Sequence, residues 1–219
     1  MLDAGWVNTK TVSLWILPTG NAPACYRNDV AFCDNIFGDR PRWWGIARGV
    51  IFGEDRIWIF NSDLSTLTPY DKIGVPYTPG EWVHIALVHS NGMLRAYKNG
   101  VEVGSVASGT TQQPSNNARP VLHIGGVINN SARNWTYSGL VDAVKVWKIG
   151  MTASQVQQDM NQVLSGAEPD LEAYYRMSNG SGLILTDDSI STWDGTLYDG
   201  GNGVPPDGSP PLWITPGVD

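Results

Sequence analysis

The chain of 219 residues carries few charged side chains (16%) and many glycines, prolines and tryptophans (25, 14 and 10), a composition that is typical of short strands joined by turns and disfavours an α-rich fold. Its net charge of -7 leaves no basic surface to neutralise phosphates, so we expect neither a nucleic-acid partner nor attraction to an anionic membrane. Membrane insertion is not expected either, because no apolar run approaches the roughly 18 to 20 residues that span a bilayer.

The length fits a single β-sandwich domain, since sandwiches of this size can bury a substantial core as one unit. We therefore expect one domain over residues 1–219, in which 200–219 form an extended tail rich in Gly and Pro. Because the first predicted strand follows Met1 almost directly, we interpret the chain as part of a larger protein.

The first predicted strand covers 10–17, and the only two cysteines, Cys25 and Cys33, follow it. With seven residues between them they can close a small disulfide loop if their ends meet. The alternative is two unrelated thiols, because the spacing matches no common zinc pattern. We favour the disulfide, which is typical of an oxidising location, and hence a secreted or cell-surface protein.

The strongest hairpin signal is the stretch GEWVHIALVHSNGMLRAYKNGVEV, residues 80–103. Its turns Asn91-Gly92 and Asn99-Gly100 suit the positive φ angles of a type I′ turn, so the stretch predicts a meander of three strands. The strand beginning at Trp82 is apolar on both faces, which indicates a central position. Further strands are predicted at 44–52, 55–60, 120–126, 138–147 and 171–177.

One helix is predicted, over 152–166. Thr152 and Gln155 fit a capping box, and Gly166 can supply the left-handed residue that ends a helix. We expect its apolar stripe to cover one edge of the sandwich. The stripe consists of Val156, Met160, Val163 and Leu164. Long polar loops, where function usually lies on a β scaffold, are predicted at 61–79, 105–119 and 127–138.

The order of these elements resembles the laminin G-like and pentraxin-like domains of the concanavalin A-like superfamily. The resemblance covers about 11–198 and depends most on GEWVHIALV with its Asn-Gly turn and on GLVDAVKVW followed by the capped helix. It implies an all-β fold of two antiparallel sheets packed as a jelly-roll sandwich, one of them concave, with one short helix. It also implies an extracellular setting and glycan or protein binding, often beside a structural calcium. The Asp-Gly-rich first strand of the family is reduced here to LDAGWVN, which weakens the case for a calcium ligand from that segment.

Asp142 interrupts an apolar row, because alternation along SGLVDAVKVW places it on one face with Leu140, Val144 and Val146. A buried carboxylate needs a cation, an Arg or converging N–H groups. In the family that this chain resembles, the equivalent aspartate often binds calcium. We therefore predict calcium ligands among the following residues: Asp142, Asn129 and Asp188, with Asn130 and Asp187 as further candidates. The alternative is a structural aspartate, hydrogen-bonded to a turn or a strand end.

Aromatic residues in the loops lie among side chains that form hydrogen bonds, a mixture that suits stacking on sugar rings while amides and guanidinium groups bind hydroxyls. The alternative is that these rings fill gaps between loops and sheets. The predicted sugar-binding residues are Arg42, Trp43, Trp44, Asn130, Asn134, Trp135 and Tyr137. Trp15, Trp58, Trp82 and Trp147 lie in strand patterns instead, and we expect them in the core.

The stretch EPDLE matches the E-x-D-x-E pattern of glucanases that share the jelly-roll architecture, in which alternate carboxylates project from one strand face into a cleft. Its position argues against catalysis, because Glu168, Pro169 and Asp170 follow the predicted end of the helix and Pro169 cannot donate a ladder bond. His84, His89 and His123 also form no metal or nucleophile motif, and His84 is expected to be a satisfied core side chain.

The sequence thus predicts a non-catalytic binding module that takes a glycan or a cell-surface polysaccharide, with calcium fixing its loops. Two alternatives remain open. A protein assembly module would use the same rim to contact other subunits, and a glycoside hydrolase would need Glu168, Asp170 and Glu172 aligned in a groove.

Overall fold

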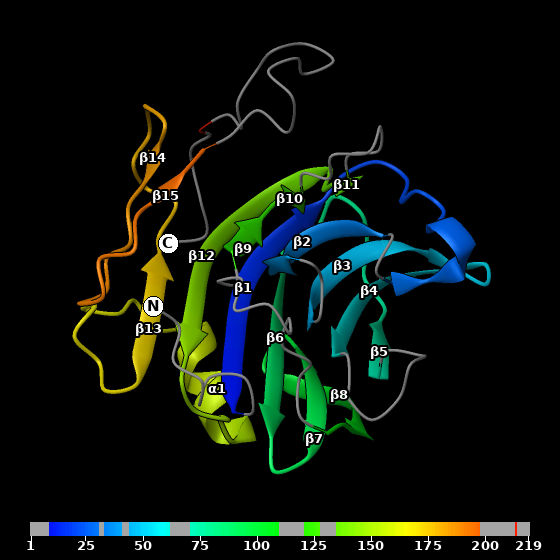
Figure 1. The fold of residues 1–219 in the computed structure, drawn as a ribbon, viewed down its shortest axis with the longest axis horizontal. Helices are drawn as coiled ribbons and strands as arrows, with labels where there is room; N and C mark the ends of the chain where they lie inside the picture. Colours follow the sequence, from blue (N-terminus) through cyan, green and yellow to red (C-terminus); the bar gives the residue numbers. More distant parts are fainter. Residues whose placement is uncertain are drawn as a thin grey trace.

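The structure is a computed structural model that describes residues 9–30, 33–40, 44–61, 71–109, 121–127, 135–197 and 213. In this part of the chain two sheets pack face to face, and one short helix, α1 (Ala153–Met160), lies outside them (Figure 1). The predicted all-β sandwich with a single short helix is therefore confirmed.

The first sheet, sheet A, is antiparallel throughout. Its strands lie in the order β13 (Leu171–Tyr175), β12 (Gly139–Trp147), β1 (Lys10–Pro18), β6 (Val83–Ser90), β7 (Met93–Lys98) and β8 (Val101–Ala107). The predicted meander is β6, β7 and β8, and both Asn-Gly turns have positive φ at Asn and at Gly. Asn99 adds a hydrogen bond, since its Oδ1 accepts from the His84 N–H at 2.9 Å.

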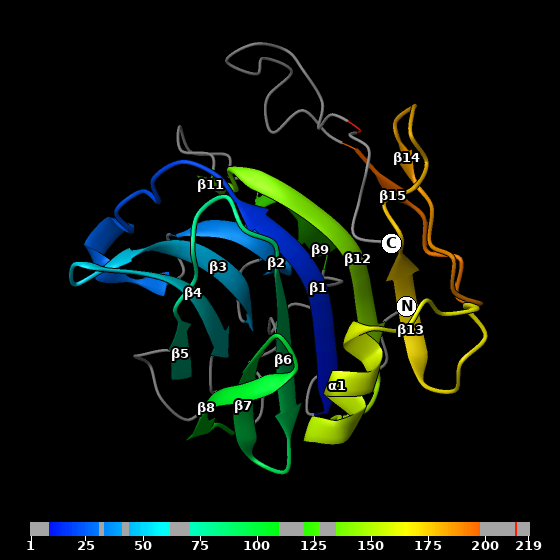
Figure 2. The ribbon, with the colours of Figure 1, turned by 180° about the vertical axis from the view of Figure 1, so that it is seen from behind.

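The second sheet, sheet B, is antiparallel except for one short parallel pairing between β11 and β2. Its order is β10 (Gly126–Val127), β11 (Trp135–Thr136), β2 (Asp34–Arg40), β3 (Trp44–Ile51), β4 (Glu54–Asn61) and β5 (Asp71–Val75), while β9 (Val121–Ile124) also pairs with β2. A small hairpin of β14 (Ile184–Leu185) and β15 (Gly195–Thr196) lies beside β13 in both views (Figures 1 and 2).

The main core lies between the sheets, where alternate residues of each strand point inward, as the period of two requires. It includes Val12, Leu14, Ile16, Ile46, Ile57, Ile59, Val83, Ile85, Leu87, Val144 and Val146. The outer face of sheet A carries a second cluster, which α1 covers, and Figure 2 shows the helix in front of the ends of β1 and β12. This second cluster contains Ala86, Val88, Tyr97, Trp147, Met151, Val156, Leu164, Leu171 and Tyr174.

A third cluster forms on the outer face of sheet B around the predicted disulfide, which is present between Cys25 and Cys33. The bridge packs on Gly49 of β3, where any larger side chain would collide with the Cys25 sulfur. The 3-10 turn η2 (Tyr26–Asn28) lies in the loop that the bridge closes. The disulfide closes this small loop, and the missing side chain at Gly49 lets the bridge lie against β3.

The predicted alternation along β12 is wrong around Asp142. Val144 and Val146 point into the core, but Ala143 has a φ of 47° and forms a bulge, so two residues of β12 face one of β1. Asp142 consequently lies opposite Trp15, whose indole N–H donates to Met160 O of α1. Directly opposite residues share a face, so Asp142 lies on the outer face of sheet A.

The helix begins as predicted, with the capping box of Thr152 and Gln155, but it ends at Met160 and not near 166. The reason lies in the sheet beneath it. The buried Lys145 ammonium group donates to the carbonyls of Asp159 and Gln162, a favourable position for a cation at a helix C-terminus. The chain then leaves the helical path. Val163, which was predicted to be part of the apolar stripe, is 63% exposed.

Candidate functional site

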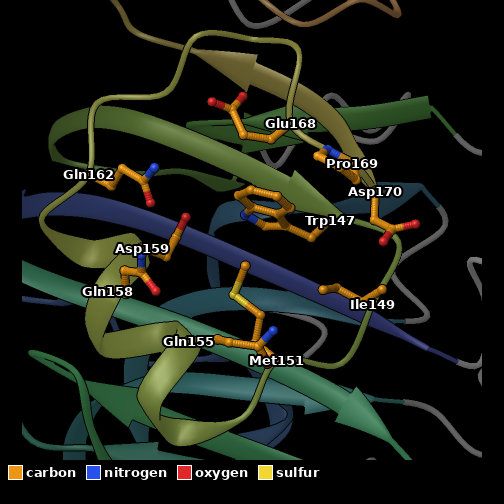
Figure 3. A pocket seen from close by; sticks show the side chains of 10 residues that line it. All are labelled: Trp147, Ile149, Met151, Gln155, Gln158, Asp159, Gln162, Glu168, Pro169 and Asp170. Atoms are coloured by element: carbon orange, nitrogen blue, oxygen red, sulfur yellow. The ribbon is translucent and has the colours of Figure 1, made fainter.

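A pocket of about 300 Å³ lies between α1, the end of β12 and the segment 168–170 that leads into β13 (Figure 3). We call it the helix pocket. It is lined by Trp147, Ile149, Met151, Gln155, Gln158, Asp159, Gln162, Glu168, Pro169 and Asp170. Its size is at the lower end of the range of small-ligand sites.

The pocket has an apolar floor and polar walls. Trp147, Ile149 and Met151 form the floor at the point where the chain leaves β12 and approaches the helix. Gln155 and Gln158 are three residues apart on α1, and Gln162 follows four residues later, so all three amides lie on one side of this segment. Such amides both donate and accept hydrogen bonds.

Asp159 closes the inner end of the pocket. Its Oδ2 accepts a hydrogen bond from Ser13 Oγ at 2.6 Å, and its Oδ1 lies 3.6 Å from Lys145 Nζ. Burial raises the pKa of Asp159, while Lys145 and the hydrogen bonds of Ser13 oppose that shift. This ion pair fixes the end of the helix on sheet A. It thereby sets the position of Gln155, Gln158 and Gln162, which we call the glutamine wall.

The indole nitrogen of Trp147 is a buried polar atom at the inner end of the pocket. The residue is 6% exposed, and its Nε1–H has no hydrogen-bond acceptor among the described residues. Figure 3 shows the nitrogen edge turned toward Asp159, and the indole N–H also lowers the pKa of that carboxyl. Because this nitrogen is itself buried and directed at Asp159, it helps to hold that carboxyl, and Trp147 offers a ligand its apolar ring surface.

The outer wall carries two further carboxylates. Glu168 accepts hydrogen bonds from the N–H and hydroxyl of Ser165 and from the Gly166 N–H. Burial would raise the pKa of Glu168, but these bonds outweigh it and lower the pKa, so the group is ionised at neutral pH. Asp170 has a φ of 64°, and its carbonyl accepts from the Lys148 N–H at 2.9 Å.

The acidic residues of the glucanase-like stretch do not share one strand face. Glu168 and Asp170 lie in the connection before β13, and their carboxylates point in different directions in Figure 3. Glu172 is buried within β13 and forms an ion pair with Lys148 Nζ at 2.5 Å. The aligned set that the hydrolase alternative requires is therefore not formed by these residues.

Two of the predicted sugar-stacking rings are buried. Trp44 is 3% exposed, lies 5.8 Å from the Phe37 ring and has Lys10 Nζ over its own ring. Tyr137 is also buried in the main core. Both rings fill gaps between loops and sheets, as the alternative interpretation had it, and neither presents a face to a sugar.

The other predicted sugar-binding positions are not tested. Arg42, Trp43, Asn130 and Asn134 lie outside the described residues. Trp135 begins β11, but its side chain is also outside what the structure describes. These residues remain predictions, and the helix pocket contains none of them.

The predicted calcium site is not assembled from the described residues. Asp142 Oδ1 accepts from the Ala143 N–H at 2.8 Å, so this aspartate supports the bulge of β12. Asp188 forms an ion pair with Arg176 at 3.4 Å, and Asp187 accepts from the backbone N–H of Tyr174 and other groups of its own loop. No group of three or more His, Cys, Asp or Glu that could hold a metal occurs within the described ranges. Asn129 lies outside them, so calcium remains a prediction.

Sequence reasoning missed most of the helix pocket. A partial signal existed, because Gln155, Gln158 and Gln162 follow the spacing of one helix face. Nothing local indicated that Trp147 would form a floor between that face and 168–170, since this depends on β12 and β13 pairing side by side.

Comparisons with known proteins support the fold and its family. The chain is 24% identical to human Pappalysin-1 over 159 residues, which is 68% of this chain and 9% of that protein. It is 31% identical to mouse Pappalysin-1 over 86 residues, 38% of this chain and 5% of that protein. The chain thus spans less than a tenth of the length of these curated relatives.

Among solved structures, a candidate carbohydrate-binding protein from Bacteroides ovatus superposes with a TM-score of 0.66 at 18% identity, over 87% of this chain and 52% of that one. At this identity the likeness concerns the fold alone. A family model described as the concanavalin A-like lectin/glucanases superfamily (Laminin_G_3) matches residues 3–157. Since that match covers more than half of the sequence and the sandwich has the expected layers, the chain belongs to the concanavalin A-like lectin/glucanases superfamily.

Proposed function

We propose that the chain is a non-catalytic carbohydrate-binding module and that the helix pocket is its sugar site. The observation that carries the proposal is the pairing of an apolar floor with a wall of amides in a pocket of about 300 Å³. Sugars present C–H faces and hydroxyls together, and a site of this composition can contact both.

The comparisons agree with this assignment. The superfamily contains lectins as well as glucanases by its description, and a structural neighbour is a candidate carbohydrate-binding protein. We place the module outside the enzymes because Glu168 is engaged by Ser165 and Gly166, while Glu172 is paired with Lys148. A retaining or inverting hydrolase needs two carboxyl groups facing one bond.

The proposed setting is extracellular, and the module would be one part of a longer protein. The disulfide between Cys25 and Cys33 supports an oxidising compartment. Among the described residues, no helix is long and apolar enough to cross a membrane.

A glycan array with and without a chelator tests the proposal. We expect binding to neutral or basic glycans, and we expect the double variant Gln158→Ala and Gln162→Ala to lose at least tenfold in affinity, because two hydrogen-bonding amides are removed. The fold should survive, because alanine is the best helix former at position 158 and the Gln162 carbonyl that accepts from Lys145 belongs to the backbone. Calcium-dependent binding would support the predicted structural ion.

Gln157→Ala is the matched control, since Gln157 lies on the same helix but does not line the pocket. Silence of the whole array would contradict the function. Unchanged affinity in the double variant would contradict the site.

A protein assembly module is the second candidate, because three apolar side chains are exposed in β14 and the segments on either side of it. These are Leu183, Ile184 and Ile190. Sedimentation analysis separates the two functions. A concentration-dependent oligomer that Ile184→Ser abolishes, together with an inactive glycan array, would favour assembly.

A further inference from the structure

The charges of the helix pocket point to a particular class of sugar. The inference rests on the proposed function and adds the substrate class to it. Three of the lining residues are acidic, Asp159, Glu168 and Asp170, and none is Lys, Arg or His. An anionic ligand would therefore meet only like charges on the walls.

The nearby cations are already paired. Lys145 lies 3.6 Å from Asp159 and donates to the carbonyls at the end of α1, so it offsets the charge of Asp159. Lys148 pairs with Glu172 outside the pocket. Arg176 pairs with Asp188 and donates to the Leu164 carbonyl. Glu168 and Asp170 consequently leave the outer wall negative.

The neutral groups set the shape of the ligand. Trp147 contributes part of an apolar floor, against which the C–H face of a sugar ring can lie. Gln158 and Gln162 can bond further hydroxyls from the opposite wall (Figure 3). We propose that the helix pocket binds a sugar unit with a free, protonated amine, and that it prefers this unit to a neutral sugar and excludes a uronic acid.

Three monosaccharides with the same ring test the proposal: glucosamine, glucose and glucuronic acid. The titrations are made at about pH 6.5, where the amine is protonated and the carboxyl is ionised. The probe is the NMR signal of the Trp147 indole N–H, assigned by its loss in Trp147→Phe. We expect glucosamine to bind roughly two- to fivefold more tightly than glucose, as for a partly screened charge pair, and glucuronate to bind more weakly than glucose.

Asp170→Asn identifies the source of the preference. Asn tolerates positive φ as well as Asp does, so the backbone at φ 64° is retained while the charge is lost. We expect the ratio of glucosamine to glucose affinity to fall toward one. Glu54→Gln is the control, since it removes one equal charge at the far end of β4, where Glu54 pairs weakly with Arg56 at 3.8 Å.

The outcomes separate this inference from the proposed function. If none of the three sugars shifts the Trp147 signal, the helix pocket is not a sugar site and both proposals fail. If the sugars bind equally well, or if glucuronate binds best, the site stands and the amino-sugar preference is overturned. The inference is also overturned if the preference for glucosamine persists in Asp170→Asn and falls in Glu54→Gln, because the charge responsible for the preference would then lie outside the pocket.

Discussion

Individual buried polar residues of this protein are held in one ionisation state by their surroundings. His84 is the clearest case. Its ring lies 5.5 Å from Trp15 on the outer face of sheet A, and its Nδ1 has no hydrogen-bond partner among the described residues. The sequence predicted a satisfied core side chain, and the structure confirms the burial but not the satisfaction. Burial first, and the charge of Lys145 second, lower the pKa of His84 to about 3.

The neutral state of His84 makes the stability of the protein depend on acid pH. In the unfolded chain His84 binds a proton below about pH 6.5, whereas in the folded chain it stays neutral down to about pH 3. The unfolded state therefore binds more protons in this window, and the free energy of unfolding falls as the pH falls. Between about pH 6.5 and 4.5 we expect a loss of about 2 kcal/mol from this group.

Urea unfolding of wild type and His84→Leu across this pH range measures the effect. The difference between the two curves isolates His84, because the other titrating groups are common to both. We expect the variant to lose about 2 kcal/mol less over the window. Parallel curves would show that His84 is not held neutral in the fold.

At the scale of the element, α1 depends on the strand beneath it. Lys145 of β12 is buried, holds two carbonyls at the helix end and faces Asp159 at 3.6 Å. Removing one member of a buried ion pair leaves an uncompensated charge, which costs more than the pair itself contributes. The end of the helix, and with it the glutamine wall of the pocket, is fixed by this contact.

We therefore expect Lys145→Met to lower the free energy of unfolding by about 3 kcal/mol or more. Adding Asp159→Asn should restore part of the loss, because the unpaired carboxylate is then gone. Chemical denaturation of the two variants checks both values. A double variant that is no more stable than the single one would mean that charge pairing does not explain the cost.

At the scale of the whole molecule, one side chain ties the two sheets together at one end. Arg48 of β3 is buried and donates to the carbonyls of Thr19, Gly20 and Ser138, which follow β1 or precede β12. It also donates to Tyr77, whose hydroxyl in turn donates to Asp55 at 2.8 Å. A side chain of sheet B thus holds the loops of sheet A.

Arg48→Met should lower the free energy of unfolding by about 3 kcal/mol or more, because a buried guanidinium group that bonds three loop carbonyls and Tyr77 is removed. Arg56→Met is the matched control, since Arg56 is partly exposed and its ion pair with Glu54 is long, at 3.8 Å. That variant should change stability by less than about 1 kcal/mol. If thermal unfolding shows the same loss of stability in Arg48→Met and Arg56→Met, the hydrogen bonds of Arg48 do not explain its contribution.

Features set by neighbouring residues could be read from the sequence. The Asn-Gly turns, the capping box at Thr152 and the short disulfide loop all follow from the chemistry of a few adjacent positions, and the structure confirms each. Hydrophobic alternation was enough to predict the strands of the meander. The fold class follows from these local agreements taken together.

Features that depend on contacts between distant segments were missed. The bulge at Ala143 has no local signal in the sequence, because residues with positive φ are usually Gly or Asn and this one is Ala. The early end of α1 depends on Lys145, which the strand pattern placed on a face without indicating its partner. The helix pocket is of the same kind, since its walls meet only when β13 returns beside β12.

The sulfur bridge that rests on Gly49 bears on how this protein can be prepared. Bacterial cytoplasm keeps thiols reduced, whereas the periplasm and the secretory pathway oxidise them. Material purified from these two sources would share one sequence but differ in whether Cys25 and Cys33 are joined beside the outer face of sheet B. Binding data from the two preparations describe different molecules, so the host used for expression becomes part of the result.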